Sequence, residues 1–351
     1  MNRSIWAWVR VLGGVAILAV LLWRLGTGAF LDGLRLIDAP TLTVAFAIGV
    51  ATTVFSAWRW CLVARGLGLR LSLRGAVADY YKALFINAAL PGGILGDVDR
   101  AVQHGRDGGD VGKSVRAVVL ERTAGQVVLV TVGLAVLLTV PSPVLTHLHA
   151  HATAVGGSAA AVAVVALLLV LAVGKLRTGA SRWARGLSTA VTEVREGLLA
   201  RRNWPGIVLA STVVLAGHLA TFVVAARAAG SDASVLELAP LMLLALLAMT
   251  LPVNVGGYGP REAVTAWAFG AAGLSASQGL TIAVIYGLFA FVAALPGLVV
   301  IVRRAIRPAR TRAVVQISPA PALLTIVPVL PVARPATPAT LPVRQLVGSG
   351  A

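Results

Sequence analysis

The stretch LPGGILGDVDR at residues 90–100 interrupts one long apolar segment, and LPVNVGGYGPRE at residues 251–262 interrupts another. Each stretch begins with Leu-Pro, continues through several glycines and ends with an arginine beside acidic residues. Proline ends a helix because it has no backbone N–H, and glycine readily adopts turn conformations. Irregular backbone at membrane depth is tolerated only where it is buried in protein or lines a cavity. If the chain lies in a membrane, these two stretches predict two broken, re-entrant segments inside it.

The composition of the whole chain places it in a membrane. It has 351 residues, of which 58% are apolar and 12% charged, with a mean hydropathy of +0.88. A soluble domain carries about 25% charged residues, so a soluble globular enzyme and a disordered chain are both excluded. We therefore expect an all-α polytopic membrane protein with about eight helices. The clear spans are 9–23, 42–57, 117–140, 153–173, 206–228 and 279–302, and the broken ones are 76–96 and 236–273.

The basic residues fall on one side of these segments. The chain has 30 Lys and Arg against 13 Asp and Glu, a net charge of +17. Of these basic residues, 22 lie in alternate loops and the termini, whereas the opposite loops hold two. The positive-inside rule then predicts a multi-pass protein with both termini in the cytoplasm, and it explains the charge without nucleic acid as a partner. The single cysteine, Cys61, is expected to pack as a small apolar side chain.

The order of the segments repeats. A clean, clean, broken, clean order occurs in 9–140 and again, in the opposite sense, in 153–302. Inverted repeats with interrupted segments at matching positions are typical of secondary transporters, with the site near the midplane. Residues 1–312 thus form one transmembrane domain. Its loop 174–205 is expected to form an amphipathic helix on the cytoplasmic leaflet, or else a plain connector. Residues 313–351, with seven of the 17 prolines, are expected to be a disordered cytoplasmic tail.

The ends of the two breaks carry the chemistry. Asp97 is suited to N-cap the helix after the first break, and Pro260 suits the first turn after the second. Arg100 and Arg261 then lie near helix N-termini, where the helix dipole disfavours a cation unless an anion lies between them. Two such arginines, one per half, predict a shared site for a lipid phosphate or pyrophosphate. The alternative is a pair of local structural locks, in which each arginine bonds to an acid next to it, namely Asp97 or Asp99 for the first and Glu262 for the second.

A third motif, ERTAGQ at residues 121–126, opens the span 117–140. Ionisable residues inside a membrane usually face a cavity or a partner. At helical spacing Arg122 and Gln126 share one face, and Glu121 and Gly125 share the next. Alternatively, Arg122 only extends to the interface.

Further polar residues lie near the breaks or inside a span. Lys82 is a candidate to attract a phosphate, Asn87 and Asn254 are expected to bond to loop backbone, and His218 is expected to form a hydrogen-bonded helix contact. No metal site, cofactor or catalytic residue is predicted. The candidate substrate-binding residues are Lys82, Asn87, Pro91, Gly92, Gly93, Gly96, Asp97, Arg100, Glu121, Arg122, Asn254, Gly256, Gly257, Gly259, Arg261 and Glu262.

These motifs carry a family resemblance. LPGGILGDVDR after Tyr80, Tyr81 and Asn87, then ERTAGQ and LPVNVGGYGPRE, resembles the transmembrane region of lysylphosphatidylglycerol synthases, which are flippase-like integral membrane proteins. The resemblance covers roughly residues 5–305. It implies an inner-membrane protein of about eight helices that moves a lipid between leaflets. The soluble acyltransferase domain of the bifunctional synthases has no counterpart after residue 312, so aminoacyl-lipid synthesis is not expected.

Three functions are open at this point. The first is translocation of an anionic phospholipid or a polyprenyl-phosphate-linked glycan, without ATP, since no P-loop pattern occurs. The second is a membrane enzyme acting on a lipid phosphate or a lipid-linked sugar, for which Asp32 and Asp38 are the paired carboxylates. The third is an accessory scaffold for a cell-envelope glycosyltransferase complex, with an envelope-biosynthesis enzyme as partner. We expect the first, and therefore a protein that is not an enzyme.

Overall fold

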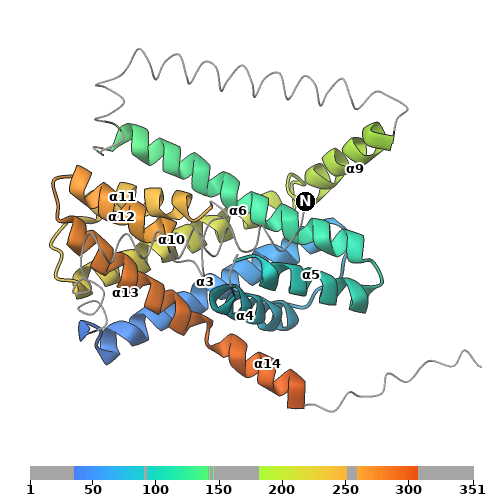
Figure 1. Cartoon of the computed structure of the whole chain (residues 1–351). Coiled ribbons are helices and arrows are strands. Elements are labelled where there is room, and N and C mark those ends of the chain that lie inside the picture. The colour runs from blue at the N-terminus through green and yellow to red at the C-terminus, as the bar shows by residue number, and fades with distance from the viewer. Residues whose placement is uncertain are drawn as a thin grey trace, which may run out of the picture. The chain divides into compact units, whose positions relative to one another are not determined.

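The part of the chain described by the computed structural model is entirely helical. It comprises residues 35–90, 93–140, 142, 145, 182–250 and 259–306. This confirms the predicted all-α polytopic class. The helices, shown in Figure 1, are α3 (Ala39–Gly66), α4 (Leu73–Ala89), α5 (Leu95–Gly108), α6 (Val111–Thr139), α9 (Arg182–Gly197), α10 (Trp204–Ala228), α11 (Val235–Ala248), α12 (Pro260–Ala271), α13 (Ala276–Ala294) and α14 (Pro296–Ile306).

Four stretches of helix are long and apolar enough to cross a bilayer. They are α3, α6, α10 and the continuous stretch formed by α13 and α14. The 28 residues of α3 extend about 42 Å, against a hydrocarbon core of about 30 Å. These helices confirm four of the predicted clean spans. The predicted spans 9–23 and 153–173 lie outside the described residues, as does the tail 313–351.

The span expected at 279–302 is divided near its end. Leu295 is the C-cap of α13, and Pro296 begins α14. Proline has no backbone N–H to donate to the preceding turn, so α13 ends before it. The second residue of α14, Gly297, lies against α4. A Cβ at Gly297 would be 2.1 Å from the carbonyl oxygen of Tyr81, so only glycine allows this approach.

Both broken segments form helical hairpins. Helix α4 packs against α5, and α11 packs against α12. These helices have 17, 14, 14 and 12 residues in chain order. They are about 18–26 Å long, which is short of the bilayer core. Gly96 permits the first hairpin, since a Cβ there would be 2.1 Å from the Ala83 carbonyl oxygen.

The two halves use the same pattern of helix contacts. The helices α3, α4, α5 and α6 of the first half correspond, in that order, to α10, α11, α12 and α13 of the second. When each helix is exchanged for its counterpart, every main pair of contacting helices becomes another pair that is also in contact. For example, α5 packs on α6 as α12 packs on α13, and α6 packs on α11 as α13 packs on α4. Helices α3 and α10, which are counterparts of each other, are also in contact. The predicted repeat therefore appears in the contacts of the described helices.

Two peripheral features of the sequence analysis can also be located. A helix does form in the loop 174–205: it is α9, and the Arg116 Nε donates to Glu193 Oε1 at 2.7 Å to join it to α6. Its place on the membrane surface stays a prediction. Asp38, a carboxylate of the enzyme alternative, accepts a hydrogen bond from the Thr41 N–H at 2.9 Å and so caps α3.

Candidate functional site

A buried carboxylate of α6 organises the first hairpin. Glu121 is 0% exposed. Its Oε1 accepts hydrogen bonds from Arg59 Nε at 3.0 Å and from the Tyr80 hydroxyl at 3.2 Å. Its Oε2 accepts one from Arg100 Nη2 at 2.7 Å. Helices α3, α4, α5 and α6 therefore meet at one carboxylate, in the middle of the first half.

Asp97 extends this arrangement to the surface of α6. Its Oδ1 accepts from Arg100 Nε at 2.9 Å and from Arg122 Nη2 at 2.8 Å. Its Oδ2 accepts from Asn87 Nδ2 at 3.3 Å, and Asn87 Oδ1 accepts from the Gly96 N–H at 2.7 Å. The five ionised residues joined in this way form what we call the Glu121 cluster: Arg59, Asp97, Arg100, Glu121 and Arg122.

Two expectations about α5 are wrong. The helix begins at Leu95 with Ile94 as its N-cap, so Asp97 lies inside the first turn and bonds to side chains. Arg100 is consequently in the second turn of α5, beyond the reach of the positive end of the helix dipole. The dipole therefore gives no reason for an anion beside Arg100. The prediction fails because Asp97 has stronger partners available in two arginines than in backbone N–H groups.

The Glu121 cluster holds more positive than negative charge. It has three arginines and two carboxylates, an excess of one positive charge. Arg59 and Arg100 are buried, and the Arg100 guanidinium lies 4.6 Å and 4.5 Å from the ring centroids of Trp60 and Tyr80. The Arg122 side chain is 41% exposed. Since the buried arginines pair with Glu121, the excess charge is accessible at Arg122.

Arg122 opens onto an apolar groove between α5 and α6. The groove has a volume of about 670 Å³, and its polar residues include Asp97, Arg122 and Gln126. Arg122 and Gln126 share this face, as their spacing predicts, whereas Glu121 faces the interior. The wall is mainly aliphatic, with Val98, Val115, Val118, Val119, Val127 and Val130 among its residues.

The second hairpin carries a smaller ion pair. Arg261 and Glu262, both buried, begin α12 after Pro260, which occupies the first turn as predicted. Arg261 Nε donates to Glu262 Oε1 at 3.0 Å, and Glu262 Oε2 accepts from the Gly259 N–H at 2.6 Å. The Arg261 guanidinium lies 5.3 Å from the ring centroid of Tyr286. Each hairpin therefore has a buried arginine that pairs with a buried glutamate and lies over a tyrosine ring.

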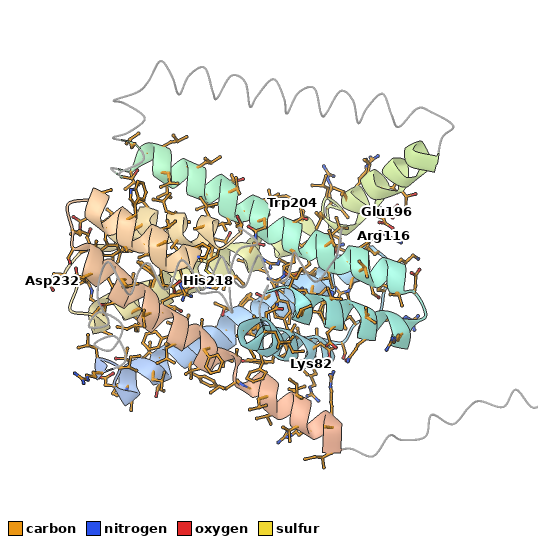
Figure 2. All side chains as sticks on the ribbon, viewed as in Figure 1. Lys82, Arg116, Glu196, Trp204, His218 and Asp232 are labelled. Carbon is orange, nitrogen blue, oxygen red and sulfur yellow. The ribbon has the colours of Figure 1, made fainter. Side chains whose placement is uncertain are left out.

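Helix α10 contacts the Glu121 cluster and the tyrosine beside the second ion pair. The Ser211 hydroxyl accepts from Arg59 Nη1 at 3.0 Å, and His218 Nδ1 lies 2.8 Å from the Tyr286 hydroxyl. The hydrogen-bonded helix contact predicted for His218 is confirmed. Figure 2 labels His218 on α10. One transmembrane helix thus touches the polar residues of both halves.

The contacts also match the alternative of local locks. Arg100 bonds to Asp97 and Arg261 bonds to Glu262, whereas Asp99 pairs with Lys82, whose Nζ lies 2.7 Å from Asp99 Oδ2. An anion shared between Arg100 and Arg261 stays a prediction.

The remaining candidates lie in the breaks. The turns at Gly93 and Gly259 have φ of 61° and 115°, which glycine adopts readily. The other candidates of the breaks lie outside the described residues: Pro91, Gly92, Asn254, Gly256 and Gly257.

Sequence reasoning missed Arg59. The charge count placed it in a loop after the apolar segment 42–57, but α3 continues to Gly66 and buries this side chain. The local sequence carries no signal for this burial, because an arginine between two tryptophans at the end of an apolar run equally suits the membrane interface. Ser211 likewise carries no signal.

No group of three or more His, Cys, Asp or Glu that could hold a metal ion occurs within the described ranges. The ionised residues of the Glu121 cluster pair with one another, and this arrangement suits the binding of a charged group.

Comparison with known proteins agrees with this description. A family model described as the lysylphosphatidylglycerol synthase TM region matches residues 8–297, which include both hairpins and the whole Glu121 cluster. No curated protein matches the chain. Because the family match covers most of the sequence, this chain belongs to the family of the lysylphosphatidylglycerol synthase transmembrane region and is a multi-pass membrane protein with a lipid-related role.

Proposed function

We propose that the chain translocates an anionic lipid or lipid-linked precursor between the leaflets of the inner membrane, with both termini in the cytoplasm. The observation that carries this proposal is the excess positive charge of the Glu121 cluster at Arg122, on the wall of an apolar groove. A phosphate supplies the negative charge that the cluster lacks, and guanidinium groups bind phosphate with two parallel hydrogen bonds. The aliphatic wall suits an acyl or polyprenyl chain.

Asp97 gives this binding a structural consequence. Arg100 and Arg122 both donate to its Oδ1. A phosphate bound to Arg122 would compete with Asp97 for the same guanidinium, and Asp97 would then pair with Arg100 alone. Since Asp97 and Asn87 connect α5 to α4, the arrival of a head group would change the contacts within the first hairpin.

The second hairpin is the counterpart in the other half. Arg261 lies at the start of α12, beside Glu262 and Tyr286. In the proposed cycle the halves rock about α3 and α10, and the head group passes from the residues of one hairpin to those of the other. The energy comes from a gradient, a partner protein or the lipid's own imbalance. The chain is a transporter in this proposal and not an enzyme.

The test is lipid movement in proteoliposomes. Phosphatidylglycerol and phosphatidylcholine with a fluorescent acyl chain are compared by dithionite quenching. The key variant is Arg122→Gln, which leaves two arginines and two carboxylates and so keeps the buried charges balanced. Hydrogen bonds to a charged group contribute about 1.5–3 kcal/mol, so movement of the anionic lipid should slow by about tenfold or more.

The matched control is Arg106→Gln, an exposed arginine at the end of α5 that should move lipid at the unaltered rate. Equal movement of both lipids, or full activity of Arg122→Gln, would contradict the proposal. Chemical conversion of a lipid without movement would favour the enzyme alternative, and neither conversion nor movement would favour the scaffold.

A further inference from the structure

A second hollow lies apart from the groove, where α3 ends and α4 begins. Its volume is about 580 Å³, and it is lined by Cys61, Arg65, Leu69, Arg70, Leu71 and Ser72. None of these residues belongs to the Glu121 cluster. The hollow is therefore a cavity separate from the groove of the proposed transport site.

The hollow results from the way in which α3 ends. The Leu69 N–H donates to the Ala64 carbonyl at 2.9 Å, and the Gly68 N–H donates to the Arg65 carbonyl at 3.0 Å. Gly68 has φ of 75°. These are the bonds of a Schellman motif, which reverses the chain at a glycine. The turn brings Arg70 back to the last turn of α3, where Arg65 lies.

The hollow is basic and has no acidic residue of its own. Arg65 and Arg70 are both exposed, and the next acid along the chain is Asp79, which pairs with Arg304. Neither Arg65 nor Arg70 forms an ion pair with an acid of the described residues. Two neighbouring guanidinium groups repel each other, and an anion between them removes that repulsion.

The rest of the lining adds a preference for an amphiphile. Ser72 is the N-cap of α4, so the positive end of that helix dipole lies at the rim of the hollow. Leu69 and Leu71 are half-buried, and Leu71 packs against the core cluster that contains Cys61 and Trp60. Basic and apolar surfaces meet here at the end of a membrane span, the arrangement by which membrane proteins bind anionic head groups.

We propose that this hollow binds the phosphate of an anionic phospholipid, held between Arg65 and Arg70, with the glycerol and the upper acyl chain against Leu69 and Leu71. The bound lipid joins the end of α3 to the start of α4 and so fixes the base of the first hairpin. The positive-inside rule assigns this end of α3 to the cytoplasmic leaflet.

Ser72 provides the position for a direct probe of this site. Cys61, the only cysteine of the chain, is buried and reacts poorly, whereas Ser72 is exposed and lines the hollow. In the Cys61→Ala background, Ser72→Cys supplies a thiol whose rate of alkylation by a small maleimide reports occupancy. The full chain is placed in nanodiscs of POPC, with or without POPG, and in POPC nanodiscs with free inorganic phosphate. We expect POPG to slow alkylation and free phosphate to leave the rate unchanged.

The decisive variant is the double substitution Arg65→Gln and Arg70→Gln. Because hydrogen bonds to charged groups are lost, POPG should bind about tenfold or more weakly and its protection of the thiol at position 72 should disappear. The matched control is Arg201→Gln and Arg202→Gln, which removes the same charge from two exposed arginines outside the hollow and should retain the protection. Native mass spectrometry, which counts POPG molecules retained by each variant, gives an independent measure, and an unchanged melting temperature shows that the variants are folded.

Three results would overturn the proposal. The first is alkylation at position 72 that does not depend on POPG when Arg65 and Arg70 are both present, and the second is equal loss of protection in the control variant. The third is equal protection by free phosphate, which would assign the hollow to a soluble anion. All three are separate from lipid movement, so failure here leaves the proposed transport function intact.

Discussion

Replacing Glu121 by glutamine tests whether the Glu121 cluster holds the first half together. The substitution keeps the side-chain volume but removes the negative charge between Arg59 and Arg100. Both arginines are buried, with exposed fractions of 5% and 1%. Arg59 would keep a hydrogen bond to Ser211 and Arg100 would keep Asp97. The glutamine side chain would place its N–H₂ group where a carboxylate oxygen now accepts a hydrogen bond. At least one guanidinium N–H would then face another donor and lose its acceptor.

The size of the effect follows from this geometry. Removing one partner of a buried ion pair costs about 3–5 kcal/mol, because the other charge is left uncompensated. At about 2 °C per kcal/mol for a chain of this size, Glu121→Gln should lower the melting temperature by about 6–10 °C.

The assay is thermal unfolding in nanodiscs, followed by the fluorescence of the chain's eight tryptophans. The control is Glu193→Gln, which removes the partner of Arg116, a side chain that is 43% exposed. An exposed ion pair contributes about 0–1 kcal/mol, so this variant should shift the melting temperature by about 2 °C or less. Equal shifts for the two variants would refute the reasoning, since they would mean that water or lipid reaches Glu121 as freely as Glu193.

Two further predictions concern the hairpin and a helix cap. Gly96→Ala should push α5 away from α4 and lower both the melting temperature and lipid movement, because its Cβ would be 2.1 Å from a backbone carbonyl oxygen. The control Gly112→Ala should leave both nearly unchanged, because its Cβ would lie 3.1 Å from the guanidinium of a flexible arginine side chain. Hydrogen bonds from the side chain and the N–H of Thr41 hold the pKa of Asp38 below its usual value. The stability that this cap gives α3 is therefore fully present above the unfolded pKa of about 4, and it is lost as the pH falls through the lower pKa of the folded state. Deuterium exchange of the first turn of α3 should accordingly gain an acid-dependent component that Asp38→Asn lacks, and identical pH profiles would contradict this.

The hairpins and the polar motif could be predicted from the sequence because their signals are local. Leu-Pro followed by glycines marks a helix end wherever it occurs, and the breaks at residues 90–100 and 251–262 do separate pairs of helices that pack together. The spacing of Arg122 and Gln126 is likewise a property of one helix, and both line the groove. Local rules were sufficient for these features.

The partners of Glu121 could not be predicted in this way. Arg59 is 62 residues away along the chain, and its pairing depends on how α3 packs against α6. A hydropathy pattern treats every arginine as exposed, and it therefore ends the apolar segment 42–57 before Arg59. A neutralised arginine continues a membrane helix, and only the tertiary structure shows that Glu121 neutralises it.

The buried Arg–Glu pairs of Arg59 and Arg100 with Glu121 and of Arg261 with Glu262 are hard to explain by stability alone. A well-packed hydrophobic substitute for a buried ion pair is often as stable as the pair or more so, because burying two charges costs free energy. Each hairpin nevertheless keeps such a pair over a tyrosine ring, and the first hairpin adds Asp97, which two arginines share. A shared carboxylate has two pairing states that differ by which guanidinium it neutralises, and an incoming phosphate would favour one of them. In a hairpin whose helices are joined through that same carboxylate, we expect charge pairing and helix position to be coupled, and the proposed translocation uses this coupling whereas a structural lock does not.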